Sequence, residues 1–375
     1  MHILILNAGS SSLKASIIDP ATGREAGRAD ARTGDRTWAV VVEEVLGRLD
    51  LEGVGAVGHR VVHGGVRFRG PALVDDDVLA GIDALAQLAP LHNPIASETI
   101  RLAQRRLPGV PHVASFDTAF HAALQPAEYR YAVPDAWFRD WGIRRFGFHG
   151  LSVEWALWRA AELLERDVDD LRLVVAHLGS GCSVTAVLGR RSVSTSMGMT
   201  PLEGLMMGTR AGSIDPGIPL FLLREGRLSL DDLADALEQQ SGLLAMAGTT
   251  DMREVVAAEA RGDGRAAMAL QMFVRRAAAG IAGVATALPG LDAIVFTGGI
   301  GEHSGPVRRA IVERLGVWGV EPVEASDVTE DGVLSAADAR VAILRVEARE
   351  DMVIAAQAAA LLGLRPEGAR PLSGS

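Results

Sequence analysis

Lysine is almost absent from this chain. Among its 375 residues there are 36 arginines but a single lysine, Lys14, which closely follows the small-residue run NAGSSS at positions 7–12. Glycine and serine let a turn close around phosphate oxygens through backbone N–H groups, and an ammonium group adds a compact positive charge. The run therefore predicts a phosphate-binding loop. For the loop taken alone, a hairpin turn with one surface lysine is the alternative.

Three other scarcities exclude classes of protein. The only cysteine, Cys182, rules out an internal disulfide and fits a reducing compartment, so we expect a cytoplasmic protein. A net charge of −10 and a pI near 5.4 argue against a nucleic-acid partner, which requires a basic face. The apolar run at positions 3–6 is too short for a signal peptide, and we expect no membrane partner.

The composition supports a sizeable folded core. Hydrophobic residues make up 48% of the chain and charged residues 22%, which provides ample material for buried sheets. A chain of 375 residues exceeds what one compact core usually supports. We therefore expect a globular protein with two domains.

One local pattern occurs twice. An apolar strand at 2–6 is followed by the small-residue loop and a second strand at 14–19; likewise, strands at 173–177 and 183–188 flank a turn that begins with Leu178. Two apolar strands joined by a tight turn are typical of a hairpin. The repeat predicts two related domains, each contributing one loop to a shared cleft.

A third glycine turn, at 298–302, separates an expected strand at 293–297 from an expected helix at 304–315. Glycines there let the backbone approach a flat ligand. Further helices are expected at 75–88, 93–106, 153–165, 230–240, 265–287 and 351–364, with a frayed tail at 365–375. Alternating strands and helices indicate an α/β fold with mixed β-sheets flanked by helices.

Four segments place charged residues among glycine and proline: GHRVVHGG at 58–65, FDTAFH at 116–121, FGFHG at 146–150 and TSMGMTPLEGLMMGTR at 195–210. Each has a structural alternative, because an aspartate at a strand end is often a cap and an exposed arginine is often only solvated. Together with two phosphate-type loops, they favour a functional site.

The chain resembles the acetate and propionate kinase family of the actin and hexokinase-like superfamily. These segments carry the resemblance together with PLHNP, HLGSG, SGLL, DMR, FTGGIGE and the pair Glu350-Asp351, nearly from end to end. It implies two related domains, 1–148 with 352–375 and 149–351, with an interdomain cleft. It also implies a homodimer that reversibly transfers the ATP γ-phosphoryl group to a short-chain carboxylate, in line and directly.

The resemblance also implies site residues. Catalytic roles fall on Asp117, His149 and Arg210, and carboxylate binding falls on Arg60, Val62, Leu91, Phe148 and Pro201. ATP binding falls on Lys14, Ser10, Ser12, His177, Leu178, Gly179, Ser180, Gly181, Asp251, Met252, Arg253, Gly299, Ile300, Gly301, Glu302 and His303. Mg²⁺, with Mn²⁺ as an alternative, is expected near Asn7 and Glu350.

This phosphoryl transfer requires fixed cations more than it requires a general base. A carboxylate with a pKa of about 4 is already ionised at pH 7, so its attack on phosphorus needs no general base. Both reactants are anionic, and fixed cations must offset their repulsion. Arg60 and Arg210 suit this task, and His149 would donate a hydrogen bond. We interpret Asp117 chiefly as an orienter of an arginine or of a metal-bound water, although the family commonly labels it an acid/base.

Several alternatives stay open at this stage. One methylene changes binding by only about 1–3 kcal/mol, so acetate and propionate are not separated. A butyrate kinase or a non-catalytic actin-like nucleotide-binding protein is also conceivable. The chain departs from the family pattern at Ser180, Leu151, Val153 and His303, and it is shorter than usual between Lys14 and Arg60. We expect a modest loss of nucleotide affinity from Ser180.

Overall fold

The structure is a computed structural model that describes every residue except 10–11, 325–327 and 365–375. Ser10 and the expected frayed tail therefore lie outside the described residues. Contacts divide the chain into two compact units. Unit 1 comprises Met1–Ala122, Phe148–Trp158 and Arg349–Ser375, and unit 2 comprises Ala123–Gly147 and Arg159–Ala348.

The units and the predicted domains assign some residues differently. Unit 2 takes in residues 123–147, which the sequence-based division gives to the first domain, and unit 1 takes in residues 149–158 and 349–351, which that division gives to the second. Because the units follow from contacts alone, the functional domain boundaries stay a prediction.

Unit 1 contains a six-stranded mixed sheet in the order β3-β2-β1-β4-β6-β5. Its strands are β1 His2–Ala8, β2 Ser12–Ile18, β3 Glu25–Arg32, β4 Val54–Val61, β5 Ala72–Leu73 and β6 His112–Phe116. The first three are antiparallel neighbours, β1, β4 and β6 run parallel, and β5 is antiparallel to β6.

Unit 2 contains a second six-stranded sheet in the order β11-β12-β10-β7-β8-β9. Its strands are β7 Arg172–Leu178, β8 Cys182–Leu188, β9 Arg191–Thr195, β10 Ala293–Thr297, β11 Gly332–Val333 and β12 Ala342–Arg345. Read from the other end, the directions repeat those of unit 1: three antiparallel neighbours, parallel β7, β10 and β12, then an antiparallel edge. The prediction of two related α/β domains is confirmed.

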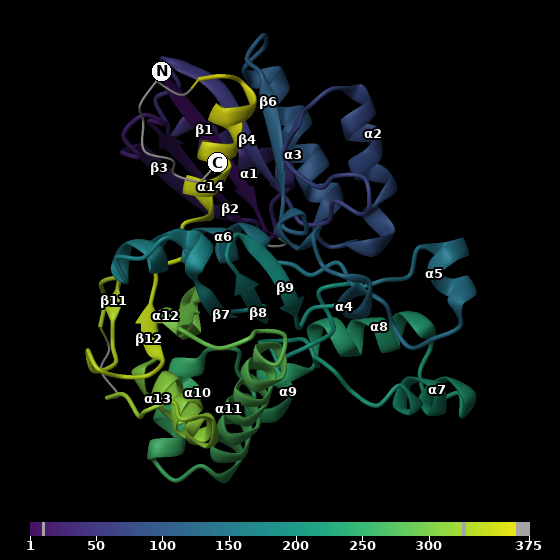
Figure 1. Cartoon of the computed structure of the whole chain (residues 1–375). Coiled ribbons are helices and arrows are strands. Elements are labelled where there is room, and N and C mark those ends of the chain that lie inside the picture. The colour runs from purple at the N-terminus through teal and green to yellow at the C-terminus, as the bar shows by residue number, and fades with distance from the viewer. Residues whose placement is uncertain (10–11, 325–327, 365–375) are drawn as a thin grey trace. The chain divides into compact units, whose positions relative to one another are not determined.

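Helices flank both sheets (Figure 1). Unit 1 holds α1 Trp38–Gly47, α2 Asp76–Ala84, α3 Asn93–Arg106 and α14 Glu350–Leu361. Unit 2 holds α4 Pro126–Tyr129, α5 Asp135–Trp141, α7 Gly217–Arg224, α8 Leu230–Gln239, α9 Gly242–Ala247, α10 Met252–Ala260, α11 Gly264–Ala285, α12 Gly298–His303 and α13 Gly305–Arg314. Helix α6, Gly150–Leu163, begins in unit 1 and ends in unit 2. The helix expected at 75–88 instead divides into α2 and a single 3₁₀ turn at Ala86–Leu88.

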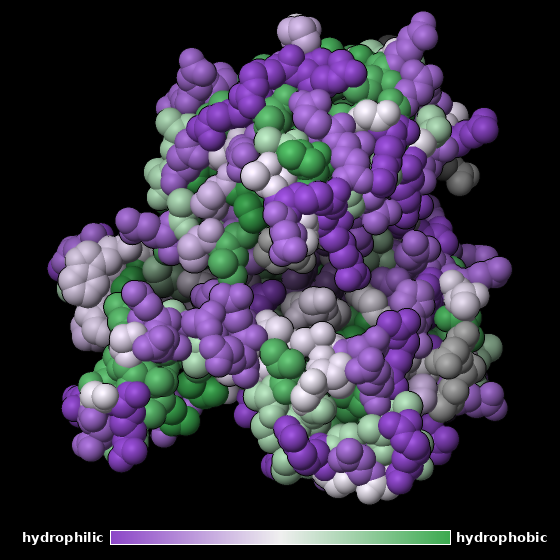
Figure 2. All heavy atoms as spheres, turned by 180° about the vertical axis from the view of Figure 1, so that it is seen from behind, coloured by the Kyte–Doolittle hydropathy of each residue, from purple (hydrophilic) through white to green (hydrophobic). Residues whose placement is uncertain are grey.

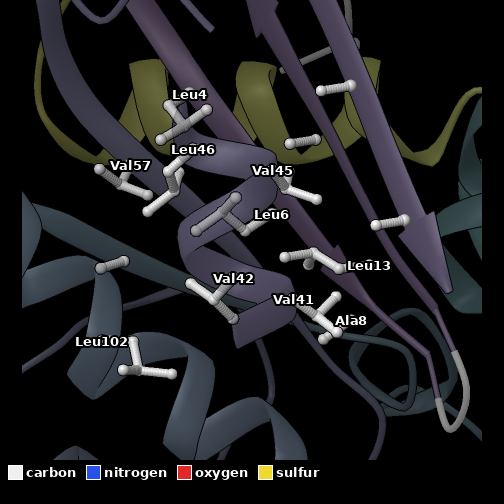
Figure 3. Packing of buried hydrophobic residues seen from close by; sticks show 14 of the residues in the cluster. Leu4, Leu6, Ala8, Leu13, Val41, Val42, Val45, Leu46, Val57 and Leu102 are labelled. Carbon is white, nitrogen blue, oxygen red and sulfur yellow. The ribbon is translucent and has the colours of Figure 1, made fainter. Parts of the chain in front are cut away.

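Strand β1 is buried on both faces, which explains why its sequence is an apolar run and not an alternating pattern. Leu4 and Leu6 pack in a cluster with Val41 and Val45 of α1 (Figure 3). The alternate residues of β1 pack in another cluster with residues of α14. The sheet of unit 1 is thus held between helices, and its strand ends are fixed in place.

Hydrophilic residues cover much of the face drawn in Figure 2, with hydrophobic residues between them. Among the described α-helices of eight or more residues, α7 is the one without a buried residue, although its sequence GIPLFLLR is almost wholly apolar. Within the described part of the chain, no helix has both the length and the apolar character needed to cross a membrane.

Candidate active site

Three polar residues of unit 1 lie at the carboxyl ends of neighbouring parallel strands. Asn7 is near the end of β1, Arg60 is near the end of β4, and Asp117 directly follows β6. The register pairs β1 with β4 and β4 with β6 up to these ends. In open α/β sheets this edge is where ligands bind. The topology therefore brings together residues that are more than 50 positions apart in the sequence.

Arg60 and Asp117 form a two-pronged ion pair. Arg60 Nε donates to Asp117 Oδ1 at 3.0 Å, and Nη2 donates to Oδ2 at 2.6 Å. The Asp117 side chain is 1% exposed and that of Arg60 is 15% exposed. A planar guanidinium with two parallel bonds to a carboxylate has a fixed orientation. This geometry agrees with the interpretation of Asp117 as an orienter of an arginine.

Burial and pairing act in opposite directions on the ionisation of this pair. Burial raises the pKa of Asp117 to about 6, although Arg60 beside it favours the charged carboxylate. Burial also opposes the charged form of Arg60, but the carboxylates of Asp117 and Glu350 outweigh it and raise the pKa of Arg60. At pH 7 the pair therefore consists of a carboxylate and a guanidinium cation.

Asn7 and Glu350 provide the oxygen atoms that a magnesium ion prefers. Glu350 is the first residue of α14, and its Oε2 accepts a hydrogen bond from Asn7 Nδ2 at 2.7 Å. Arg60 Nη1 donates to Asn7 Oδ1 at 3.2 Å. Among the described residues, no group of three or more His, Cys, Asp or Glu side chains could hold a metal ion. Mg²⁺ is commonly bound through one or two carboxylates, water and phosphate oxygens, so this sparse pair fits it.

The backbone of His149 is also organised by Asp117. His149 adopts a left-handed conformation with φ 59°, which is uncommon outside glycine. Its backbone N–H donates to the Asp117 carboxylate, and the Gly150 N–H donates to the Asp117 carbonyl at 2.9 Å. A Cβ on Gly150 would lie 2.3 Å from that carbonyl oxygen. Asp117 thus fixes both the Arg60 side chain and the start of α6.

Two of the three unit 1 residues expected to line an apolar pocket are buried. Phe148 and Val62 have little exposure, whereas Leu91 is exposed. Leu151 and Val153, two of the positions where departures from the family pattern are expected, are buried hydrophobic residues. Apolar side chains at these two positions therefore suit the buried surroundings of α6.

Sequence reasoning assigned no role to the residues that hold Phe148. The ring of His63 meets the Phe148 ring edge-on at a centroid distance of 5.3 Å, and the Phe148 carbonyl is 2.9 Å from His121 Nε2. The Asn93 amide exchanges hydrogen bonds with the backbone N–H and C=O of His63. Burial lowers the pKa of His121 to about 4, so this ring is neutral. Their signal was their presence in the GHRVVHGG, PLHNP and FDTAFH segments.

The first hairpin has the expected form. Gly9 N–H donates to the Ser12 carbonyl at 2.8 Å, which closes the turn between β1 and β2. Lys14 lies opposite Asn7 in the register of these strands, and its side chain is exposed. The lysine is thus next to the strand end that carries the Arg60 site.

The second hairpin offers mainly backbone groups. Its turn is closed by the Gly179 N–H, which donates to the Gly181 carbonyl at 3.0 Å. The Leu178 side chain is fully buried, so only its backbone can reach a ligand. Cys182 is buried too, and its Sγ lies 3.3 Å from the Gly179 carbonyl oxygen. Ser180 at the turn is exposed.

The glycine turn at the start of α12 packs on the second hairpin. Gly298 has φ 75°, and a Cβ there would lie 2.8 Å from the Leu178 carbonyl oxygen. Gly299 is exposed, Ile300 is partly exposed and Gly301 is buried. The turn thus needs glycine at position 298 for both its conformation and its close approach.

Glu302 and His303, the last two residues of α12, were both expected to contact the nucleotide, but one side chain is buried and the other is exposed. The buried carboxylate of Glu302 accepts a hydrogen bond from the Ala348 N–H at 2.9 Å and lies 3.9 Å from Arg345 Nη2. These contacts turn its side chain into unit 2. The adjacent His303 is exposed.

The DMR segment forms the start of α10. Asp251 caps this helix by accepting from the Arg253 N–H, and the Arg253 side chain pairs with the Asp251 carboxylate at 2.6 Å. The hydrogen bond from Arg253 is the main cause that lowers the pKa of Asp251. Met252 is buried in the core, so of the three predicted contacts only Asp251 and Arg253 present side chains to solvent.

The last two predicted residues, Pro201 and Arg210, come together in unit 2. Arg210 Nη1 donates to the Pro201 carbonyl at 2.7 Å. The turn that carries Arg210 is held by hydrogen bonds from Leu243 N–H to the Met207 carbonyl and from Met207 N–H to the Arg210 carbonyl. The guanidinium is therefore attached to a braced loop.

Two matching sheets with polar groups and tight turns at their strand ends define the chain as a two-domain α/β protein. A sequence model of the Acetokinase family matches residues 32–356, and the chain belongs to this family.

Similar proteins cover nearly the whole chain. The acetate kinase of Deinococcus radiodurans is 45% identical over 97% of this chain and 99% of its own length, and that of Thermotoga maritima is 39% identical over 95% and 97%. Among solved structures, a propionate kinase from Francisella tularensis has a TM-score of 0.88 at 36% identity, covering 95% of this chain and 98% of its own. The acetate kinase of Porphyromonas gingivalis has a TM-score of 0.86 at 31% identity, covering 96% and 99%.

Proposed function

We propose that this chain is an acetate kinase, which reversibly transfers the γ-phosphoryl group of ATP to acetate and forms acetyl phosphate and ADP by direct in-line transfer. The full-length similarity to acetate kinases supports the reaction class. The observation that carries the mechanism is the mostly buried Arg60 guanidinium, fixed by two hydrogen bonds to Asp117 at the carboxyl ends of β4 and β6.

Arg60 and Arg210 neutralise the negative charge of the carboxylate and the phosphoryl oxygens in this proposal. Each guanidinium is held before substrate arrives, Arg60 by Asp117 and Arg210 by the Pro201 carbonyl. Pre-oriented charges stabilise a transition state without reorganisation at the moment of reaction. Acetate is already ionised at pH 7, so Asp117 need not take a proton from it. His149 would donate a hydrogen bond to the transferring group.

The nucleotide would use both hairpins and the turn at α12. We assign phosphate contacts to Lys14 and to backbone N–H groups of residues 179–181, and adenosine contacts to the partly exposed Ile300 and its neighbouring glycines. Asn7 and Glu350 would hold the magnesium ion. The ion supplies further positive charge to the phosphate oxygens.

The first test is a hydroxamate assay with ATP, Mg²⁺ and acetate, propionate or butyrate. Acetate is expected to give the highest kcat/KM, because sequence relatives that are 44–45% identical over 97% of this chain are named acetate kinases. The preference is expected to be modest, since one methylene is worth about 1–3 kcal/mol. Nucleotide binding without acyl hydroxamate from any of the three acids would contradict the proposal and favour a non-catalytic nucleotide-binding protein.

We further propose that the chain forms a homodimer, as the family resemblance implies. Helix α7 supports this proposal, because Ile218, Leu220 and Phe221 are about half exposed in the single chain. Exposed apolar clusters of this kind commonly mark protein interfaces. Sedimentation analysis is expected to give twice the chain mass, and Phe221→Glu is expected to shift the equilibrium to monomer. A wild-type protein that sediments as a monomer at micromolar concentration would contradict it.

The buried single cysteine, Cys182, supports a cytoplasmic location, since a reducing compartment suits a chain without disulfides. Fractionation of the cells that produce this protein tests this expectation. Recovery of most of the protein outside the cytoplasm would contradict it.

A further inference from the structure

The segment that carries Pro201 and Arg210 is held by hydrogen bonds to a second segment of unit 2, residues 129–147. Arg145 makes three of the contacts: its Nη1 donates to the carbonyls of Ser196 and Met197 at 3.0 and 2.9 Å, and its Nη2 donates to Glu203 Oε1 at 2.7 Å. One guanidinium thus joins both ends of the turn that contains Pro201.

Tyr131 makes a second bridge across the same turn. Its hydroxyl donates to Glu203 Oε2 and accepts a hydrogen bond from the Met199 N–H at 2.9 Å. Burial is the largest cause that raises the Tyr131 pKa, and the hydrogen bond to Glu203 adds to it, so the hydroxyl keeps its proton. It can therefore act as donor and acceptor at the same time.

Gly198 allows these groups to meet. A Cβ at this position would lie 1.8 Å from Glu203 Oε2 and 2.3 Å from the Tyr131 hydroxyl oxygen. The Gly198 carbonyl also accepts hydrogen bonds from the Phe146 and Gly147 N–H groups at 3.0 and 3.3 Å. The backbone of this segment is thus held from both sides.

The contacts lead directly to the proposed acceptor-site residues. Pro201 lies between Met199 and Glu203, which Tyr131 holds, and its carbonyl accepts from Arg210 Nη1. Any shift of the turn therefore moves the hydrogen-bond acceptor that orients the Arg210 guanidinium. A displacement of about 1 Å is enough to cost an enzyme orders of magnitude in rate.

We propose that Tyr131, Arg145 and Glu203 form a clamp that positions Pro201 and Arg210 for carboxylate phosphorylation. They are positioning residues that act through the turn. The proposal rests on the proposed function only for the roles of Pro201 and Arg210. The hydrogen bonds of the clamp do not depend on those roles, because they join residues of the folded chain to one another.

The chain offers a matched control, because it has only two tyrosines. Tyr129 lies in the same segment, where its ring stacks on Phe138 and lies under the Arg144 guanidinium. Tyr131→Phe is expected to lower kcat/KM for acetate by about tenfold or more, while KM for ATP changes less than about twofold. Tyr129→Phe is expected to stay near wild type. Equal effects of the two changes, or full activity of Tyr131→Phe, would overturn the clamp.

A second measurement does not depend on activity. Amide hydrogen exchange over residues 196–210 is expected to be faster in Tyr131→Phe than in wild type, because the Met199 N–H loses its acceptor, and unchanged in Tyr129→Phe. Unchanged exchange in Tyr131→Phe would overturn the clamp even if wild-type protein phosphorylates no carboxylate. An inactive wild type with the expected exchange pattern would reject the proposed function and leave the clamp standing.

If Tyr131→Phe does not fold, Glu203→Gln replaces it, since the amide keeps the size of the side chain but loses the charge that pairs with Arg145. The same loss in kcat/KM and the same faster exchange are expected.

A third measurement combines Tyr131→Phe with Arg210→Lys. If Tyr131 acts through Arg210, its loss costs less in the Arg210→Lys protein than in wild type, and fully additive losses would overturn that step.

Discussion

The two units share one sheet topology but hold different chemistry at their strand ends. In unit 1 the ends of β1, β4 and β6 bring together side chains that pair with one another, Asn7, Arg60 and Asp117. In unit 2 the ends of β7 and β10 lead into glycine turns that pack backbone against backbone. The fold therefore supplies the position, and the local residues decide whether side chains or backbone N–H groups face a ligand.

Each unit also has a largely buried arginine that pairs with carboxylates near the ends of the parallel strands. The two arginines differ in exposure, and this difference distinguishes a functional ion pair from a structural one. Arg60 is 15% exposed and faces the Asn7 and Glu350 side chains. Arg345 is 2% exposed, with its guanidinium between Asp331 and Glu302. A ligand can reach the first arginine, while the second joins Glu302 of α12 to Asp331, which directly precedes β11. Changes at Arg60 should therefore affect turnover, and changes at Arg345 should affect stability.

The largest effect is expected for Arg60→Ala. Loss of a fixed cation at the reacting groups is expected to reduce kcat about 10²–10³-fold, because charge neutralisation is the main lever in phosphoryl transfer. Calorimetric titration with ATP should show nearly unchanged binding. Arg139→Ala is the control, since Arg139 pairs with the exposed carboxylates of Asp135 and Asp140. Full turnover in the Arg60 variant would remove the assigned role.

Arg345→Met is expected to give the opposite result. It leaves the buried Glu302 without its arginine and leaves the partly buried Asp331 with Arg159 as its remaining arginine, so the free energy of unfolding should fall by about 3 kcal/mol. Urea denaturation measures this change. Arg309→Met, which breaks an exposed pair with Glu313, should cost less than about 1 kcal/mol. Equal losses in the two variants would contradict the distinction between buried and exposed pairs.

A smaller effect, dependent on pH, is expected at Glu154. Burial raises its pKa to about 7, and Gln357 Nε2 donates to its Oε2 at 3.0 Å. The folded pKa lies above the usual value of 4.5, so the folded state holds a proton that the unfolded state loses. This contribution is complete below about pH 4.5 and is lost as the pH rises through about 7. Glu154→Gln should therefore raise the melting temperature at pH 8 more than at pH 5. An equal shift at both pH values would contradict the assignment.

The sequence predicted the repeated hairpins because their signals are local. Small-residue turns between apolar runs at 2–6 and 173–177 require no knowledge of distant residues, and the helix Asn93–Arg106 was predicted at its observed bounds. Helix α1 was not predicted, since its run of three valines is as typical of a strand as of a helix. Its helical form depends on packing against β1 and β2.

The site was predicted in its residue types but not in its pairings. The interpretation that Asp117 orients an arginine could not name Arg60, because the order of β4 and β6 in the sheet brings them together across 57 positions. The hydrogen bonds of Tyr131 and Arg145 to Glu203 likewise join residues that are 72 and 58 positions apart in the sequence. Short motifs mark Arg60, Asp117 and Glu203 but not Tyr131 or Arg145, and only the sheet and loop geometry assigns their partners.

The most direct test of the account is a double-mutant cycle between Arg60 and Asp117, measured as kcat/KM for acetate. If Asp117 serves to orient Arg60, Asp117→Asn should reduce the rate in the wild-type background. The same change should have little further effect in Arg60→Ala. If the two losses multiply in full, Asp117 acts independently of Arg60, and the claim that a fixed cation replaces a general base is contradicted.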